Sequence, residues 1–148
     1  MYLLANYKDL DFYAVAPKGF QISPDLQLHL EERGVRLHFT DQLNEVLPKV
    51  DCIYMTRIQD EYDLSGESGK IDLANFSLTE ENVNLLPEHA IILHPLPRRQ
   101  EISSGIDANP RAMYWSQLRN GVYIRAALLL YIFGKNEQLP IIQEKSGS

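Results

Sequence analysis

Val50-Asp51-Cys52-Ile53-Tyr54-Met55 is a short apolar run in the middle of the chain, and it predicts a buried β-strand. Three further runs predict strands: Phe12-Tyr13-Ala14-Val15-Ala16, Val35 to Phe39, and Ile91-Ile92-Leu93. Amphipathic stretches with helix signals separate them. This alternation predicts an α/β fold, in which a parallel sheet carries helices on its two faces as a three-layer α/β/α arrangement.

Capping residues mark where the intervening helices begin. Ser23 and Pro24 are typical of the N-cap and first position of a helix, which we expect to end at Gly34. Asp41 is expected to cap a short helix bearing Leu43, Val46 and Leu47, and Thr79 one from Glu80 to Leu86. Ser65 to Gly69 has the composition of a mobile loop.

The last predicted helix runs from Pro110 to Phe133 and becomes apolar on all sides after Val122. A helix that is hydrophobic on every face needs burial on every face. We therefore expect its second half, Ala126 to Phe133, to dock onto something outside this chain. The tail from Glu144 to Ser148 is expected to fray.

The composition is that of a soluble globular protein, with 45% hydrophobic and 23% charged residues. A net charge of −6 and scattered basic residues argue against a nucleic-acid partner. Neither a membrane-spanning run nor a signal peptide is evident, so we expect a cytoplasmic protein. Cys52, the single cysteine, is expected as a small core residue. The four histidines lack metal-ligand spacing, and no metal or other cofactor is expected.

Polar side chains follow the third predicted strand. In an extended segment Arg57, Gln59 and Glu61 share one face, because side chains alternate. Arg57 offers a planar fork suited to a carboxylate, Gln59 offers a donor and an acceptor, and Glu61 can hold the arginine. Ligands of parallel sheets lie beyond the carboxyl ends of the strands, which directs attention to these residues. Taken alone, they also fit a solvated surface strand.

A second polar segment, His94-Pro95-Leu96-Pro97-Arg98, follows the fourth predicted strand. The two prolines fix φ and remove two backbone donors. They leave carbonyl groups that no helix uses and that suit recognition of amine or amide N–H groups. Taken alone, this segment also fits a rigid turn.

Together, Met55-Thr56-Arg57-x-Gln59 and His94-Pro95-Leu96-Pro97-Arg98-x-x-Glu101-Ile102 resemble the aspartate carbamoyltransferases, which join carbamoyl phosphate to L-aspartate in pyrimidine biosynthesis. The resemblance covers Phe12 to about Gly134 and continues through Asp107, Pro110-Arg111-Ala112, Tyr114, Gln117, Asn120-Gly121 and Arg125. Pro95 is informative because ornithine carbamoyltransferases typically carry cysteine at that position.

The resemblance implies a Rossmann-like aspartate-binding domain over residues 1–134, followed by a tail over 135–148. It implies that Arg57 and Gln59 bind aspartate, and that the carbonyls of Pro95 and Leu96 hold the carbamoyl amide and the attacking amine. Glu61, His94 and Arg98 are expected to support them. The neutral α-amino group would attack the carbamoyl carbon directly, with catalysis by orientation and electrostatic stabilisation.

Other parts of the family's active site are not found in these 148 residues. They include the Ser-Thr-Arg-Thr phosphate-binding loop of the family's N-terminal domain, and the first strand of the aspartate-binding domain with its Gly-Arg-Thr-x-x-Ser segment. We expect a carbamoyl-phosphate-binding domain or chain to supply the phosphate-binding loop, with helix 110–133 crossing to it and a homotrimer as the complete enzyme. This chain alone is then expected to be inactive.

Two positions depart from the family pattern, since Asp60 and Tyr62 stand where basic residues are common. A non-catalytic homologue serving as a binding or assembly module is therefore the alternative to a catalytic half. A transferase for another amino acid is a third interpretation. Arg57, Gln59 and the Pro95–Leu96 turn favour the catalytic one.

Overall fold

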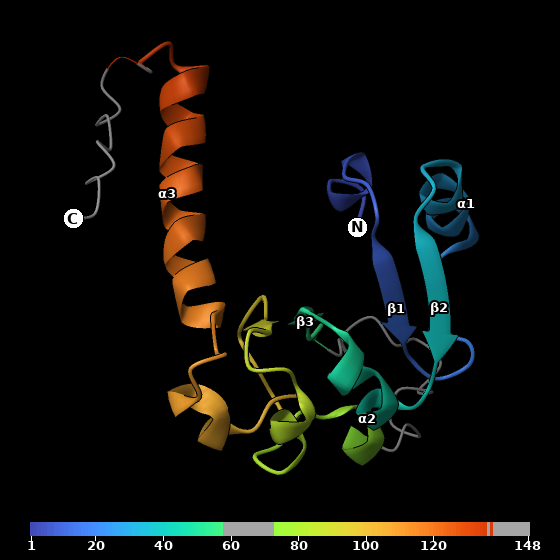
Figure 1. The fold of residues 1–148 in the computed structure, drawn as a ribbon. Helices are drawn as coiled ribbons and strands as arrows, with labels where there is room; N and C mark the ends of the chain where they lie inside the picture. The colour runs from blue at the N-terminus through green and yellow to red at the C-terminus, as the bar shows by residue number, and fades with distance from the viewer. Residues whose placement is uncertain (58–72, 136, 138–148) are drawn as a thin grey trace, which may run out of the picture.

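The computed structural model describes residues 1–57, 73–135 and 137, and it shows the predicted alternation of strands and helices (Figure 1). A 3-10 helix at Leu4–Asn6 precedes the first strand. The strands are β1 (Asp11–Val15), β2 (Arg36–Thr40), β3 (Cys52–Tyr54) and β4 (Ile91–Leu93), each within two residues of its predicted range. The predicted loop at 65–69 and the tail at 144–148 lie outside the described residues.

β1 and β2 form one parallel pair, connected by helix α1 (Pro24–Glu32). Ser23 occupies the predicted N-cap position of α1. The chain leaves the helix at Gly34, whose φ of 74° is a left-handed conformation that glycine accepts without steric cost. Leu30 of α1 packs against Ala5 and Val35 in a small hydrophobic core. The prediction of this βαβ unit is confirmed.

β3 and β4 form the second parallel pair, in which Cys52 lies opposite Ile91 and Tyr54 opposite Leu93. Helix α2 (Leu43–Val46) and the 3-10 helices Leu47–Lys49 and Asn82–Leu85 pack beside it. A further 3-10 turn covers Leu73–Phe76. The larger core of the molecule lies here, built from Leu43, Leu47, Ile53, Met55, Leu78, Val83, Leu86, Ala90, Ile92, Ile102, Ile106 and Tyr114.

The α/β class and the parallel strands are confirmed, but the strands are not joined into one sheet of four. Among the described residues, β1 pairs with β2 and β3 pairs with β4, which gives two separate two-stranded sheets. Figure 1 shows the β1–β2 pair and α1 on one side of the molecule and the chain around β3 at its centre. Each pair therefore has a main core of its own, although Val15 of β1 also packs against the core of the β3–β4 pair.

The predicted helix 110–133 begins four residues late, because the chain first runs beside β4. Ile92 donates its N–H to the Arg111 carbonyl at 2.8 Å and accepts from the Met113 N–H at 3.0 Å. A 3-10 helix at Ser104–Ala108 precedes this stretch. The helix itself, α3, spans Tyr114–Ile132.

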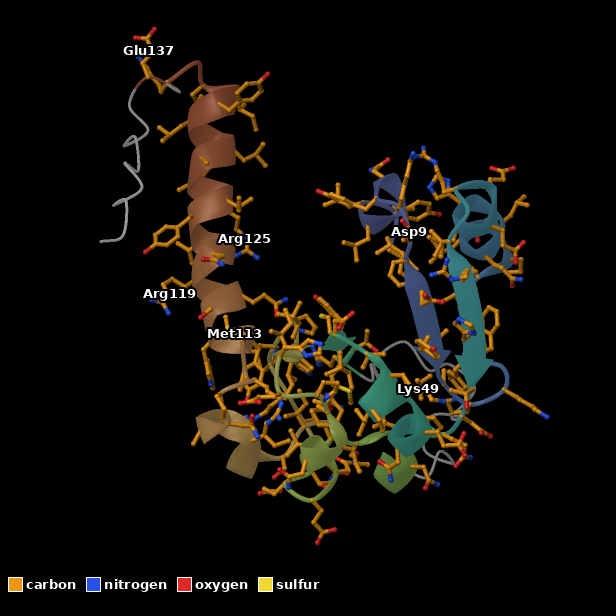
Figure 2. The ribbon with its side chains drawn as sticks, in the orientation of Figure 1. Asp9, Lys49, Met113, Arg119, Arg125 and Glu137 are labelled. Carbon is orange, nitrogen blue, oxygen red and sulfur yellow. The ribbon has the colours of Figure 1, made fainter. Side chains whose placement is uncertain are left out.

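Among the described residues, α3 is buried near its start, at Tyr114, and most of its later apolar side chains are exposed. Figure 1 shows the helix extending away from the body of the molecule. In Figure 2 Met113 lies beside the β3–β4 region, whereas Arg119 and Arg125 extend outward along the helix. The described residues contain no helix with both the length and the apolar character needed to cross a membrane.

Three local predictions are wrong in detail. Cys52 is exposed, because alternation along β3 turns Ile53 to the core and Cys52 to the other face. Asp41 does not cap α2, since Gln42 occupies the N-cap and no side chain there makes a capping hydrogen bond. The helix expected over 80–86 is the shorter 3-10 turn, although Thr79 Oγ1 does accept a hydrogen bond from the Asn82 N–H at 3.3 Å.

Candidate functional site

The two segments that carry the predicted site leave neighbouring strands in the same direction. β3 and β4 are parallel, and the Met55 N–H extends their pairing by donating to the Leu93 carbonyl at 3.0 Å. Arg57 follows three residues after the end of β3 and is half-buried. His94 follows β4 directly. Both segments therefore start from the carboxyl edge of one strand pair, where parallel sheets bind ligands.

The loop after β4 has few backbone donors. Pro95 and Pro97 have no N–H, so Leu96 carries the only backbone donor among these three residues. That N–H donates to Nδ1 of His94 at 2.8 Å. Among the described residues, none donates a hydrogen bond to the Pro95 or Leu96 carbonyl oxygen. The two carbonyl oxygens are therefore not used by hydrogen bonds among the described residues.

A glutamine from α3 joins the ends of both strands. Gln117 Oε1 accepts the His94 backbone N–H at 2.9 Å, and Gln117 Nε2 donates to the Tyr54 hydroxyl oxygen at 3.3 Å. One side chain of the first turns of α3 therefore links the last residue of β3 to the residue after β4. Sequence reasoning placed Gln117 in the family pattern but gave it no role, because its partners are 63 and 23 residues away.

Arg98, in the same loop, is held by a carboxylate that follows it in the chain. Its guanidinium forms a two-pronged ion pair with the Asp107 carboxylate, with Nη2 donating to Oδ2 at 2.7 Å. The Tyr114 hydroxyl donates to the same carboxylate at 2.6 Å. The pair with Arg98, followed by the Tyr114 hydrogen bond, lowers the pKa of Asp107 to about 2. Burial, followed by the bond to Asp107, raises the pKa of Tyr114 to about 12.

An open depression lies over this loop, lined by Pro95, Leu96, Pro97, Arg98, Trp115 and Leu118. The apolar side chains of Trp115 and Leu118 come from α3 and were not predicted as part of the site. In the part of the chain that the structure describes, no cluster of His, Cys, Asp and Glu side chains is suited to hold a metal ion.

Five of the site residues predicted from the sequence lie on described segments. Arg57, His94, Pro95, Leu96 and Arg98 lie on the two segments beyond β3 and β4. Gln59 and Glu61, together with Asp60 and Tyr62, lie outside the described residues. Asp107 and Tyr114, which hold Arg98, appeared in the family pattern without a role.

A parallel α/β fold with polar segments at the carboxyl edge of its strands defines a ligand-binding domain. The family model for the aspartate/ornithine carbamoyltransferase Asp/Orn binding domain matches residues 1–132. The chain belongs to this family. It is 41% identical over 133 residues to the aspartate carbamoyltransferase, chloroplastic, of Oryza sativa subsp. japonica, covering 86% of this chain and 36% of that protein. It is 34% identical over 132 residues to the aspartate carbamoyltransferase catalytic subunit of Aliivibrio fischeri (strain MJ11), covering 89% and 42%.

Solved structures of aspartate transcarbamoylases also match this chain. Aspartate transcarbamoylase of Trypanosoma cruzi in complex with carbamoyl aspartate and phosphate matches with a TM-score of 0.76 at 35% identity, covering 86% of this chain and 41% of that one. The catalytic subunit of M. jannaschii aspartate transcarbamoylase matches with a TM-score of 0.78 at 29% identity, covering 93% and 44%. The chain thus spans less than half the length of each of these relatives.

Proposed function

We propose that this chain is the aspartate-binding part of an aspartate carbamoyltransferase, which converts carbamoyl phosphate and L-aspartate to N-carbamoyl-L-aspartate and phosphate in pyrimidine biosynthesis. The observation that carries the proposal is the placement of Arg57 and of the Pro95–Leu96 carbonyls beyond the carboxyl ends of paired strands. An arginine fork suits a carboxylate, and free carbonyls suit N–H groups.

In this proposal Arg57 and Gln59 bind aspartate, with Arg57 on one of its carboxylates. The carbonyl oxygens of Pro95 and Leu96 accept hydrogen bonds from the carbamoyl amide and the attacking amine. The amine lone pair forms the new C–N bond, the bond from the carbamoyl carbon to the phosphate oxygen breaks, and the amine loses a proton. The protein contributes orientation and electrostatic stabilisation of the tetrahedral centre.

The rest of the site comes from a carbamoyl-phosphate-binding domain or chain. The 148 residues contain no Ser-Thr-Arg-Thr loop for the phosphate. The apolar end of α3, which extends from the body of the molecule (Figure 1), is the surface that we assign to this partner. A homotrimer in the cytoplasm is the proposed form of the complete enzyme.

The test measures carbamoyl aspartate formation by the purified chain, alone and co-produced with the preceding part of a family member, which carries its carbamoyl-phosphate-binding domain and its Gly-Arg-Thr-x-x-Ser strand. We call the latter the completed enzyme. The chain alone should show no turnover above the uncatalysed rate. The completed enzyme should carbamoylate aspartate and not ornithine. Turnover by the chain alone, or a preference for ornithine, contradicts the proposal. Assembly with aspartate binding but without turnover identifies a non-catalytic binding module instead.

A further inference from the structure

His94 and Glu101 form a buried pair beneath the loop that carries the proposed acceptor carbonyls. His94 Nε2 lies 2.7 Å from Glu101 Oε1, and their side chains are 0% and 5% exposed. Among the described residues, buried polar side chains are few: these two and Ser77. Burying such a pair gives little net stability, because desolvation offsets the attraction. Its placement therefore calls for a role other than stabilising the core.

The hydrogen-bond roles within the pair are fixed by a backbone group. The Leu96 N–H can only donate, and it donates to His94 Nδ1 at 2.8 Å. Nδ1 is then the hydrogen-bond acceptor of the His94 ring. The ring N–H proton resides on Nε2, which donates to Glu101. A directed chain of bonds thus runs from the Leu96 peptide through the imidazole to the carboxylate.

The same carboxylate oxygen holds the far end of the loop. Glu101 Oε1 also accepts the Arg99 backbone N–H at 3.0 Å. One oxygen therefore fixes the peptide of Arg99 directly and the peptide of Leu96 through His94. The segment between them, Pro97 and Arg98, is held at both ends.

Leu96 needs such support because its backbone is in an unfavourable conformation. Its φ of 46° lies in the left-handed region, which a branched side chain rarely adopts. Strain of this kind persists only when the surroundings determine it, and it concentrates at functional sites. The bond to His94 supplies such a constraint, and because the Leu96 N–H and the Pro95 C=O belong to one planar peptide, it also orients the Pro95 carbonyl.

We propose that Glu101 is a positioning residue for carbamoyl transfer, acting through His94 on the Leu96 peptide. The inference rests on the proposed function, since it assumes that the two carbonyls contact the reacting groups. Those contacts are strongest when the new C–N bond forms. Misdirected carbonyls should therefore lower kcat more than they raise the KM for aspartate.

The experiment compares Glu101→Gln with Glu101→Met in the completed enzyme. Glutamine keeps an acceptor oxygen for His94 and the Arg99 N–H, so kcat should stay within about threefold of the parent. Methionine keeps the size and removes the acceptor, and it should lower kcat by about tenfold or more while the KM for aspartate changes less than threefold. Ile106→Val, in the same core, is the control for lost stability.

Nitrogen-15 shifts of the His94 ring, measured on the full chain, separate this inference from the proposed function. The parent and Glu101→Gln should show an Nε2 proton held in a hydrogen bond, and Glu101→Met should show an Nε2 proton without that bond, because the Leu96 N–H still occupies Nδ1. If Glu101→Met does not fold, His94→Asn decides, because asparagine keeps an acceptor for Leu96 and loses the bond to Glu101; its kcat should also fall. An active parent with unchanged kcat in these variants overturns the inference. An inactive parent overturns the proposed function, and the shifts still report whether Glu101 orients His94.

Discussion

Replacing apolar residues at the exposed end of α3 with glutamine should reduce self-association of the chain. Leu128, Leu129, Ile132 and Phe133 remain between 55% and 73% exposed. Full burial of such a side chain contributes about 1.5–3 kcal/mol, so burying what remains of the four would contribute about 4–7 kcal/mol. That is comparable to the stability of a small domain, and it favours association through this surface.

Leu129→Gln combined with Ile132→Gln removes about half of that energy, or about 2–4 kcal/mol for each helix. Glutamine is a good helix former, so α3 should persist. The dissociation constant for self-association should rise by about one to three powers of ten for each helix that the contact buries, measured by sedimentation across a dilution series. Arg119→Gln, exposed on the same helix, is the matched control. A parent chain that stays monomeric at high concentration, or a double variant that associates as strongly as the parent, refutes the reasoning.

Two further predictions concern charged side chains. In the completed enzyme Arg57→Lys should lower kcat/KM for aspartate by a factor that corresponds to about 2–3 kcal/mol, because lysine keeps the charge and loses the planar fork. Binding of carbamoyl phosphate should change little. Equal effects on both substrates in steady-state kinetics would show the assignment to be wrong. Asp107→Asn should reduce the loss of folding stability at acid pH. Arg98 and Tyr114 lower the pKa of Asp107 from 3.8 to about 2, so the ionised carboxylate stabilises the fold above pH 3.8. That contribution disappears as the pH falls toward 2. Thermal unfolding between pH 2 and 7 measures this, and identical slopes for parent and variant contradict it.

The strands were predictable because local patterns determine them. The first apolar run stops at Pro17 and the last stops just before Pro95, and parallel pairing follows from the intervening helices. The capping positions were less predictable. Asp41 is a good capping residue in isolation, yet the chain places Gln42 at the start of α2. Capping preferences of single residues are weak compared with tertiary packing.

The start of α3 could not be read from the sequence, because a distant strand determines it. Residues before Tyr114 fit a helix locally, but Ile92 binds Arg111 and Met113 through its backbone. Cys52 shows the same limit, since an apolar run does not reveal which face of a two-stranded sheet is covered.

Within the candidate site, the acceptor carbonyls followed from the two prolines alone. The residues that orient them did not. Gln117 reaches His94 and Tyr54 from another helix, and Glu101 reaches His94 across a turn. Side-chain bonds between distant segments leave no periodic signal in one sequence.

The division of the strands into two pairs with separate cores has a consequence for how the chain opens. The β1–α1–β2 unit has a small core around Leu30, whereas the β3–β4 unit holds most of the buried side chains. The two units are expected to behave as foldons of unequal stability, so that amide exchange proceeds faster in β1 and β2 than in β3 and β4. Arg57 and the loop after β4 both belong to the more protected foldon. Transient unfolding of the first unit therefore leaves the geometry of the candidate site in place.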